Sequence, residues 1–495
     1  MSKIFTQRDA DWRMGRIVYQ IFVDRFFSVD PLSKQSLYPA PKHLLPWSSS
    51  PERGKKLTEV PHYAHELDFW GGDLHGIKEK LSYLTDLGID TLYLTPIFSA
   101  YSNHKYDTMD YRTISPEFGT MDDLKALIQA TKEKNIAMIL DGVFNHMSFH
   151  SPWFQDALKN PNSPYRSWFV FGENFRFPYR AWHNAPSLPE LHLENPDVRH
   201  YLWTDVVQYY LNLGIAGWRL DTAIELGFRY LQELTESAHA VKKDTVIIGE
   251  INNYPASWTS VIDGTIQLPL RDWLIQTAKG NIPASLAQAQ LNRYISDTGI
   301  EAMLKSWILL ENHDHPRVRF DLNNLPSYHF AKYLSLTLPG NLHLYQGEEW
   351  GLNGGQDPLN REPFPWHRVG QKDPYYSLHQ HMISLRKNHR ALRIGDYTAM
   401  PSSQLLAFLR TTNLHQETLI VIANPSKKPV TEWLMIPDSK LRSHLPFVDL
   451  ITGKKILDSW GTYLPLTVPP QTVYILQPQQ NTVDGYSPTK YYFED

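Results

Sequence analysis

The chain of 495 residues contains no cysteine. This absence excludes disulfide bonds, thiolate chemistry and metal sites built on cysteine, but it does not fix the cellular compartment. No apolar run is long enough to span a bilayer, and the N-terminus lacks the apolar segment of a signal peptide. We therefore expect a cytoplasmic protein with no membrane partner, although a mature secreted chain with a new start methionine would show the same features.

A strong charge of either sign is also missing. The formal net charge is −4 and no basic stripe is present, so we expect no nucleic-acid partner. A hydrophobic content of 42% excludes global disorder and allows a sizeable core. The length is enough for two or three domains. The 15 tryptophans supply flat faces that either fill large cores or contact the apolar faces of sugar rings.

Short apolar strands alternate with helical patterns over more than three hundred residues. Such alternation is typical of a parallel sheet that is buried on both faces. An eighth strand around 263–268 is weak, and no G-x-G-x-x-G motif follows the first strand, which disfavours a doubly wound sheet. We therefore predict an α/β fold, an eight-stranded (β/α) TIM barrel. The seven clear strands are 18–23, 91–96, 136–141, 217–221, 245–250, 307–311 and 341–345, and the main helices are 74–87, 121–134, 196–213 and 376–390.

Two stretches depart from this rhythm. The interval 147–195 is rich in Trp, Phe, Pro and Asn and is too long for an ordinary connection, so we predict an irregular insertion over the barrel mouth. Beyond 393 the pattern changes to short strands separated by turn residues, which predicts a C-terminal antiparallel β-sandwich over 393–495. The barrel itself is predicted over 1–146 and 196–392. Strands are expected in the sandwich at 405–410, 418–423, 447–451 and 472–476.

Charged side chains gather where the predicted barrel strands end. Arg219 and Asp221 are two residues apart in a strand and therefore share a face. Taken alone, this motif is better interpreted as a structural ion pair. However, acids and histidines also lie at the carboxyl ends of three other predicted strands, in the segments 141–146, 249–250 and 311–314. TIM barrels carry their active sites at this end, so we predict a site there.

Three kinds of site compete for these residues. A metal site would need histidine or acidic spacings that the sequence lacks. A buried charge network would leave several acids with one arginine. Two carboxylates around a glycosidic bond fit best: one is an ionised nucleophile beside Arg219, and the other is an acid whose pKa is raised by nearby negative charge and desolvation.

The four segments together resemble the α-amylase superfamily of retaining α-glycoside hydrolases (glycoside hydrolase family 13), and the resemblance covers nearly the whole chain. The signature D-x-V-x-N-H stands at 141–146 and G-x-R-x-D at 217–221. The shorter signatures G-E and N-H-D stand at 249–250 and 312–314. The combination is specific, although no single segment is.

The resemblance implies a role for each catalytic acid. Asp221 would attack the anomeric carbon, Glu250 would protonate the leaving oxygen and then activate water, and Asp314 would bind ring hydroxyls. Asp141 is interpreted as a supporting residue. Substrate binding is implied for a further set, in which a structural role is the alternative for the tyrosine and the two histidines: Tyr106, Asp107, His146, Arg219, Glu225, His313 and Arg361.

Details near these signatures indicate the subgroup. Glu225 and the segment 357–366 match cyclomaltodextrinase and neopullulanase relatives. Thr222 weakly favours cleavage of α-1,4 bonds over α-1,6 bonds. Asn252 stands where those relatives usually carry a tryptophan. We expect no extra N-terminal β-domain of the kind with which they dimerise, because the first predicted strand begins by Val18. We therefore expect a more open cleft and a monomer.

The resemblance implies hydrolysis of α-1,4 bonds in maltooligosaccharides, starch-type glucans or cyclodextrins through a covalent glycosyl-enzyme. A 4-α-glucanotransferase would share every catalytic residue and is the main alternative. A non-catalytic amylase-like partner protein is a remote one, because all three acids are present. No cofactor is required. Structural calcium stays open: Asn145 matches a calcium ligand of the family, but the Lys-His pair that assists there is missing.

Overall fold

The computed structural model describes residues 2–30, 32–441 and 444–479, and a closed barrel of eight parallel strands forms its centre. The predicted TIM barrel is confirmed, including its weak strand near residue 265. Each strand pairs with its neighbours in the order β1-β12-β11-β10-β9-β8-β7-β4, and β4 closes on β1. The strands are β1 (Ile17–Ile21), β4 (Thr91–Leu94), β7 (Ala137–Gly142), β8 (Gly217–Leu220), β9 (Val246–Ile251), β10 (Gly264–Gln267), β11 (Trp307–Ile308) and β12 (Asn341–Tyr345).

Apolar side chains fill the barrel interior below the polar end. Val18, Tyr93, Ile139, Ile248 and Trp307 belong to one buried cluster. Alternate residues of the same strands face outwards and join the larger core beneath the helices. Burial on both faces explains why the strands read as continuous apolar runs.

Helices surround the barrel, and two of the four predicted helices are not continuous α-helices. The helix predicted over 74–87 is interrupted at Lys80, although its apolar stripe stays buried on one side. The helix predicted over 196–213 contains a π-helical segment, Tyr201–Gln208. The helices are α1 (Ser2–Ala10), α2 (Leu74–Glu79), α3 (Leu81–Leu87), α4 (Met121–Glu133), α5 (Pro152–Lys159), α6 (Pro196–His200), α7 (Tyr209–Leu213), α8 (Ala223–Val241), α9 (Leu268–Ala278), α10 (Ala284–Thr298), α11 (Ile300–Lys305), α12 (Val318–Asp321), α13 (Leu325–Thr337), α14 (Pro374–Asn388) and α15 (Arg390–Ile394).

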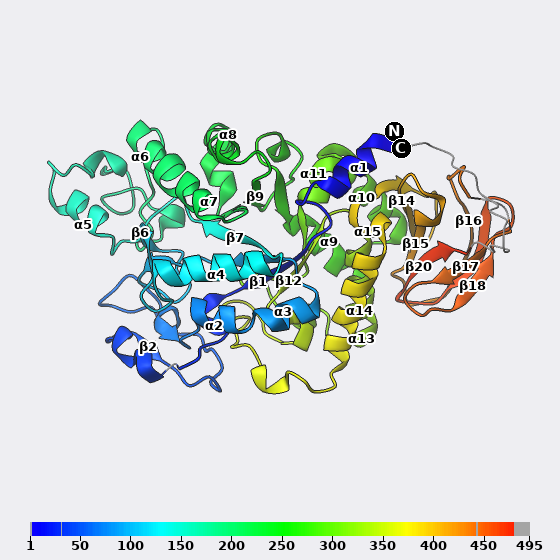
Figure 1. The fold of residues 1–495 in the computed structure, drawn as a ribbon, viewed down its shortest axis with the longest axis horizontal. Coiled ribbons are helices and arrows are strands. Elements are labelled where there is room, and N and C mark those ends of the chain that lie inside the picture. Colours follow the sequence, from blue (N-terminus) through cyan, green and yellow to red (C-terminus); the bar gives the residue numbers. More distant parts are fainter. Residues whose placement is uncertain (1, 31, 442–443, 480–495) are drawn as a thin grey trace.

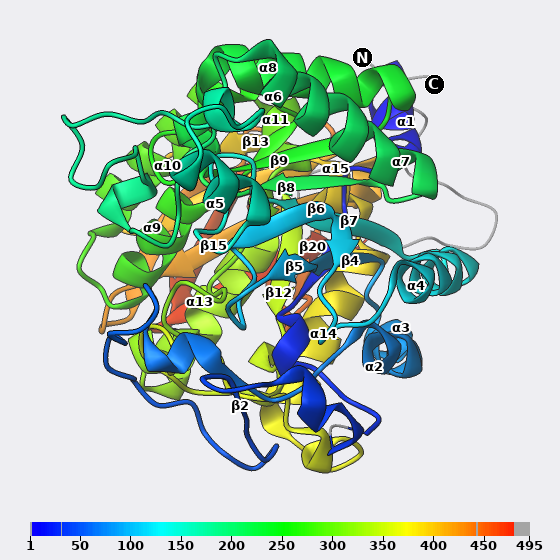
Figure 2. The same ribbon diagram turned by 90° about the vertical axis from the view of Figure 1, so that its left-hand side faces the viewer.

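The connections at the carboxyl ends of the strands are long and irregular. A hairpin of β5 (Phe98–Ala100) and β6 (Thr108–Ile114) follows β4, and the short strands β2 (His43–Leu44) and β3 (Asp68–Phe69) pair within the loop after β1. The segment 147–195 contains α5, two short 3-10 helices (Arg166–Trp168 and Trp182–Asn184) and isolated bridges. It is tied to the end of β7 by a bridge between His146 and Glu190, and Figure 2 views the molecule from this side.

The chain beyond α15 forms antiparallel sheets at the opposite end of the molecule from α5 (Figure 1). The sequence pattern located β14, β15, β17 and β20 but missed β13, β16, β18 and β19, which are short or half exposed. Residues 480–495, the end of the predicted sandwich, lie outside the described residues. The strands are β13 (Asp396–Ala399), β14 (Leu406–Thr411), β15 (Thr418–Asn424), β16 (Val430–Met435), β17 (Pro446–Asp449), β18 (Lys455–Asp458), β19 (Tyr463–Val468) and β20 (Thr472–Pro478).

Within residues 2–30, 32–441 and 444–479, no helix combines the length and the apolar character that crossing a membrane requires.

Candidate active site

A cleft of about 580 Å³ lies at the carboxyl end of the barrel strands. The three predicted catalytic acids, Asp221, Glu250 and Asp314, all line it. The predicted binding residues Tyr106, His146 and Arg361 line it as well. Their strands are separate in sequence, so the barrel closure is what brings them together. The remaining wall is made by Glu66, His104, Trp182, Leu188, Thr222, Asn252, Leu268, Asp272, His315 and Asp357.

Arg219 holds the acids at the bottom of the cleft. It lies on β8 opposite Asp141 of β7, and its Nη1 donates to both Asp141 oxygens at 2.9 and 3.0 Å. The same Nη1 donates to Asp221 Oδ1 at 3.1 Å, while Nη2 lies 3.0 Å from Glu250 Oε2. One buried guanidinium therefore serves three carboxyl groups.

This sharing changes the expected protonation of the acids. Burial raises the pKa of Asp221 well above its usual range, and Glu250, Asp141 and Asp314 add to the rise while Arg219 opposes it. Burial likewise raises the pKa of Glu250. Sequence reasoning expected Arg219 to keep Asp221 ionised, but the guanidinium divides its charge among several acids. The cluster therefore titrates as a unit that retains a proton more readily than isolated carboxyls do.

The backbone at the end of β8 is shaped around Glu250. Thr222 adopts a left-handed conformation with φ of 42°, which is rare for a β-branched residue. In this conformation its N–H donates to Glu250 Oε2 at 3.0 Å. Strained residues of this kind persist only where the surroundings fix them, and they gather at functional sites.

Asp314 sits among different partners. Arg361 Nη2 donates to Asp314 Oδ1 at 3.1 Å, and His313 Nε2 lies 3.1 Å from Oδ2. Burial alone would raise the pKa of Asp314, but His313 and Arg361 outweigh burial and lower that pKa to about 2. Asp314 is therefore an anionic hydrogen-bond acceptor rather than a proton donor.

The two histidines are neutral hydrogen-bonding groups. Burial lowers the pKa of His313 to about 3 and that of His146 to about 4. His313 is fixed by Gln20 at 2.6 Å and by the Tyr106 hydroxyl at 2.7 Å, and its ring is stacked with that of Tyr106. The Tyr106 hydroxyl also donates to Asp141 at 2.8 Å. Tyr106, between β5 and β6, is thus oriented by Asp141 of β7 and by His313 of the segment after β11.

Four predicted binding residues are not part of the cleft wall. Arg219 and His313 are buried beneath it and contact the acids that line it. Asp107 is fully buried behind it and accepts hydrogen bonds from the backbone of Tyr101 and Ser102. Glu225, in the first turn of α8, contacts His183 of the insertion at 3.1 Å. Both acids therefore support loops around the site in this structure.

The predicted calcium ligand has no acidic neighbourhood. Asn145 Nδ2 lies 3.4 Å from His146 Nδ1, and its backbone carbonyl accepts from Leu191. In the part of the chain that the structure describes, no group of three His, Cys, Asp or Glu side chains could hold a metal ion. The calcium hypothesis gains no geometric support and stays a prediction.

Sequence reasoning missed several residues of the cleft wall. Trp182 comes from the irregular insertion, Glu66 from the loop after β1, and Asp357 from the segment after β12. These segments have no periodicity that could reveal which side chain faces the site. Only the aromatic composition of 147–195 pointed in this direction.

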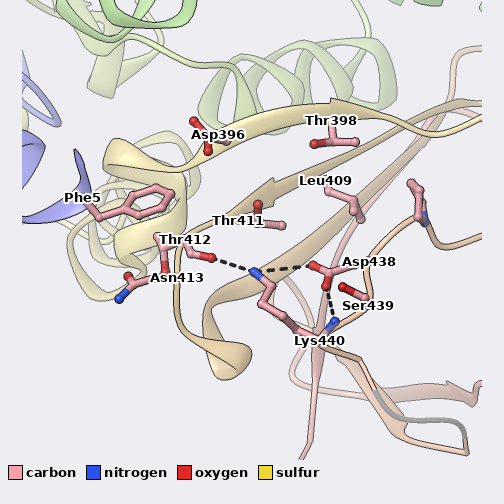
Figure 3. Close-up of a pocket in the computed structure, with 11 residues that line it drawn as sticks. Phe5, Asp396, Thr398, Leu409, Thr411, Thr412, Asn413, Asp438, Ser439 and Lys440 are labelled. Carbon is pink, nitrogen blue, oxygen red and sulfur yellow. Dashed lines mark hydrogen bonds and ion pairs between the residues drawn. The ribbon is translucent and has the colours of Figure 1, made fainter. Parts of the chain in front are cut away.

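A second cavity, of about 250 Å³, lies between α1 and the C-terminal sheet (Figure 3). Its charged groups are already paired: Lys440 donates to the carbonyl of Thr412 at 2.6 Å and lies 3.6 Å from Asp438, and Asp396 accepts from Arg8 at 2.8 Å. It lacks the facing acids of the cleft, so the cleft is the candidate active site.

Known proteins resemble this chain along most of its length. A family model described as "Alpha amylase, catalytic domain" matches residues 20–421. A cyclomaltodextrinase of Geobacillus thermopakistaniensis is 34% identical over 477 residues, which cover 93% of this chain and 76% of that protein. Neopullulanase 2 of Thermoactinomyces vulgaris is 32% identical, with 96% and 79% covered. The solved structure of a cyclic α-maltosyl-(1→6)-maltose hydrolase from Arthrobacter globiformis matches with a TM-score of 0.78 at 27% identity, over 95% of this chain and 99% of that one.

Proposed function

Because this chain belongs to the α-amylase family of glycoside hydrolases, we propose that it cleaves α-1,4-glucosidic bonds with retention of configuration. The proposed substrates are maltooligosaccharides, starch-type glucans or cyclodextrins. The names of its relatives, a cyclomaltodextrinase and a neopullulanase among them, support this substrate class.

One observation carries the mechanism: a single guanidinium contacts both Asp221 and Glu250. Two carboxyls held by one planar group lie close together, which favours the short separation of retaining enzymes over the wider one that admits a water in inverting enzymes. The contacts also leave each acid with one oxygen for chemistry. Arg219 is bonded to Oδ1 of Asp221, and both anchoring contacts of Glu250 go to Oε2.

The reaction then has two steps. Oδ2 of Asp221 forms a bond to the anomeric carbon while the bond to the leaving oxygen breaks, and Glu250 gives its proton to that oxygen. In the second step the Glu250 carboxylate takes a proton from water, the water oxygen bonds to the anomeric carbon, and Asp221 is released. Asp314 and the neutral His313 bind ring hydroxyls, and the raised pKa of Glu250 suits a general acid.

The test uses Asp221→Asn and Glu250→Gln with two substrates, maltoheptaose and α-maltosyl fluoride. Fluoride leaves without a proton, so Glu250→Gln should still release fluoride in a first turnover while it loses maltoheptaose cleavage by at least a hundredfold. Asp221→Asn should fail on both substrates. Asp122→Asn, on the exposed first turn of α4, is the matched control and should behave as wild type.

Product analysis decides the remaining points. We expect the wild-type enzyme to form new reducing ends, and proton NMR should show that these ends have the α configuration when they first form. Redistribution of maltoheptaose into longer and shorter chains without new reducing ends would indicate a glucanotransferase instead. An Asp221→Asn variant that keeps most of its activity would overturn the mechanism.

A further inference from the structure

The segment that carries Asp314 is held by one buried amide from another part of the chain. Asn360 is fully buried and lies between β12 and α14. Its Nδ2 donates to the carbonyl oxygens of His313 at 2.8 Å and His315 at 2.9 Å, and the carbonyl oxygen of Asn312 lies 3.3 Å away. The two short bonds use both hydrogens of the amide. Asn360 therefore fixes the backbone on both sides of Asp314.

The residue that follows Asn360 contacts the same backbone. Arg361 Nε donates to the carbonyl oxygen of His313 at 2.8 Å, and its Nη2 donates to Asp314 Oδ1 at 3.1 Å. The carbonyl oxygen of His313 thus accepts hydrogen bonds from two consecutive residues. These bonds leave the peptide between His313 and Asp314 little freedom to rotate.

Asn360 is itself anchored by a buried ion pair. Arg317 Nε donates to the carbonyl oxygen of Asn360 at 3.0 Å. Arg317 Nη1 donates to Glu311 Oε1 at 2.7 Å and to the carbonyl oxygen of Gln346 at 2.9 Å. Glu311 follows β11 and Gln346 follows β12, and these two strands are paired in the barrel. The anchor therefore fixes Asn360 relative to the barrel strands.

Asp314 depends on these backbone contacts more than the other two acids of the cleft do. Its side chain is 39% exposed, whereas those of Asp221 and Glu250 are 9% and 10% exposed and are held by Arg219. The side chain of Asp314 is therefore positioned mainly by its backbone and by Arg361. A displacement of about 1 Å in an active site can cost roughly a hundredfold in rate.

We propose that Asn360 is a positioning residue for Asp314. The inference rests on the proposed function and extends it to a buried residue that contacts no substrate. By fixing the backbone, Asn360 holds the Asp314 carboxylate at the sugar ring that Asp221 attacks. Only contacts that are stronger in the transition state than in the bound substrate accelerate the reaction. Loss of Asn360 should therefore lower kcat more than it raises KM.

The test compares Asn360→Ala with a matched control, Asn424→Ala. Asn424 on β15 is also fully buried, and its Nδ2 also donates to three backbone carbonyls, those of Lys428, Val468 and Pro469. Asn360→Ala should lower kcat for maltoheptaose about ten- to a hundredfold, with KM changed by less than about threefold. Asn424→Ala should leave kcat and KM within about twofold of wild type, because the C-terminal sheet does not position the acids.

A double-mutant cycle separates positioning from a purely structural role. In an Asp314→Ala enzyme the contact that Asn360 positions is already lost, so adding Asn360→Ala should lower kcat by less than about threefold. The cycle is measured with α-maltosyl fluoride, which contains the ring that is attacked and needs no proton for its leaving group. If Asn360→Ala does not fold, Asn360→Ser, which retains one donor, replaces it in the same cycle.

Three results would overturn the inference: the same fold-loss of kcat with and without Asp314, a loss confined to KM, or an unchanged kcat. Wild-type enzyme that turns over neither maltoheptaose nor α-maltosyl fluoride would instead refute the proposed function.

Discussion

Replacing Arg219 by methionine should destabilise the fold in a pH-dependent way. The guanidinium is 1% exposed and contacts three buried carboxyls, those of Asp141, Asp221 and Glu250. Removing one partner of a buried ion pair costs about 3–5 kcal/mol, because the remaining charges are left uncompensated. The unfolding entropy of a chain of 495 residues is about 1 kcal/mol/K, so we expect Tm to fall on the order of 3–5 °C at pH 7.

The pH dependence follows from the direction of the pKa shifts. Burial already raises the pKa of each of these three carboxyls. An acid with a raised pKa in the folded state costs no stability below its unfolded pKa of about 4, and its cost grows as pH rises towards the folded value. The cost is about 1.4 kcal/mol per pH unit for each proton that the folded cluster retains. Without Arg219 more protons are retained, so the Tm gap to wild type should widen from pH 5 to pH 8.

Differential scanning fluorimetry at pH 5, 6, 7 and 8 measures this gap. Arg229→Met is the control: its exposed pair with Glu233 should contribute almost nothing at any pH. If Arg219→Met does not fold, Arg219→Lys retains the charge but not the planar fork, and should show a smaller gap of the same sign. A gap that is constant or narrows with rising pH would refute the reasoning.

Two further results are expected. Because His313 has a pKa of about 3, it is neutral over the working range, so His313→Asn should lower kcat/KM without moving the acid limb of its pH profile. A shift of that limb, measured from pH 4 to pH 8, would assign it to His313 rather than to the carboxyl cluster. Gly227 lies within α8 at φ 73° and ψ 163°, a conformation that essentially only glycine adopts, so Gly227→Ala should cost about 1–3 kcal/mol. Gly172→Ala, at an ordinary φ, is its control; equal Tm values for the two variants would contradict the prediction.

The barrel could be predicted because its strands are continuous apolar runs that end at turn or charged residues. β10 gave a weak signal since it has only four residues, two of them Gly264 and Thr265. β11 is shorter still, yet its flanking residues Leu309 and Leu310 are buried, so the sequence run looked longer than the paired strand. Apolar patterning therefore reports burial more faithfully than it reports hydrogen-bonded strand length.

The site was predictable to the extent that its residues follow strands. Asp221 and Glu250 belong to regular strand ends, whose direction the barrel fixes. Trp182 and Glu66 come from irregular segments, and their direction depends on contacts that no periodicity encodes. The motif that contains Glu225 was recognised in the sequence, but the contact of this residue with His183 was not predictable. That contact depends on how the insertion packs against the start of α8.

The shared guanidinium also explains how one cluster can supply both an acid and a nucleophile. One positive charge facing three buried carboxyls cannot keep all of them ionised, so the cluster tends to hold a proton. Asp141 accepts hydrogen bonds from Arg219 and from the hydroxyls of Tyr93 and Tyr106. These donors stabilise its ionised form, so Asp141 is a poor site for the proton that the cluster retains. Asp221 Oδ2 and Glu250 Oε1 are both free of the anchoring contacts, so a proton shared by the two acids faces the cleft, and on Glu250 it can be given to the leaving oxygen. The Arg219→Met variant tests this directly, because losing this cation should add protons to the cluster and protonate the nucleophile as well, which lowers kcat most at low pH.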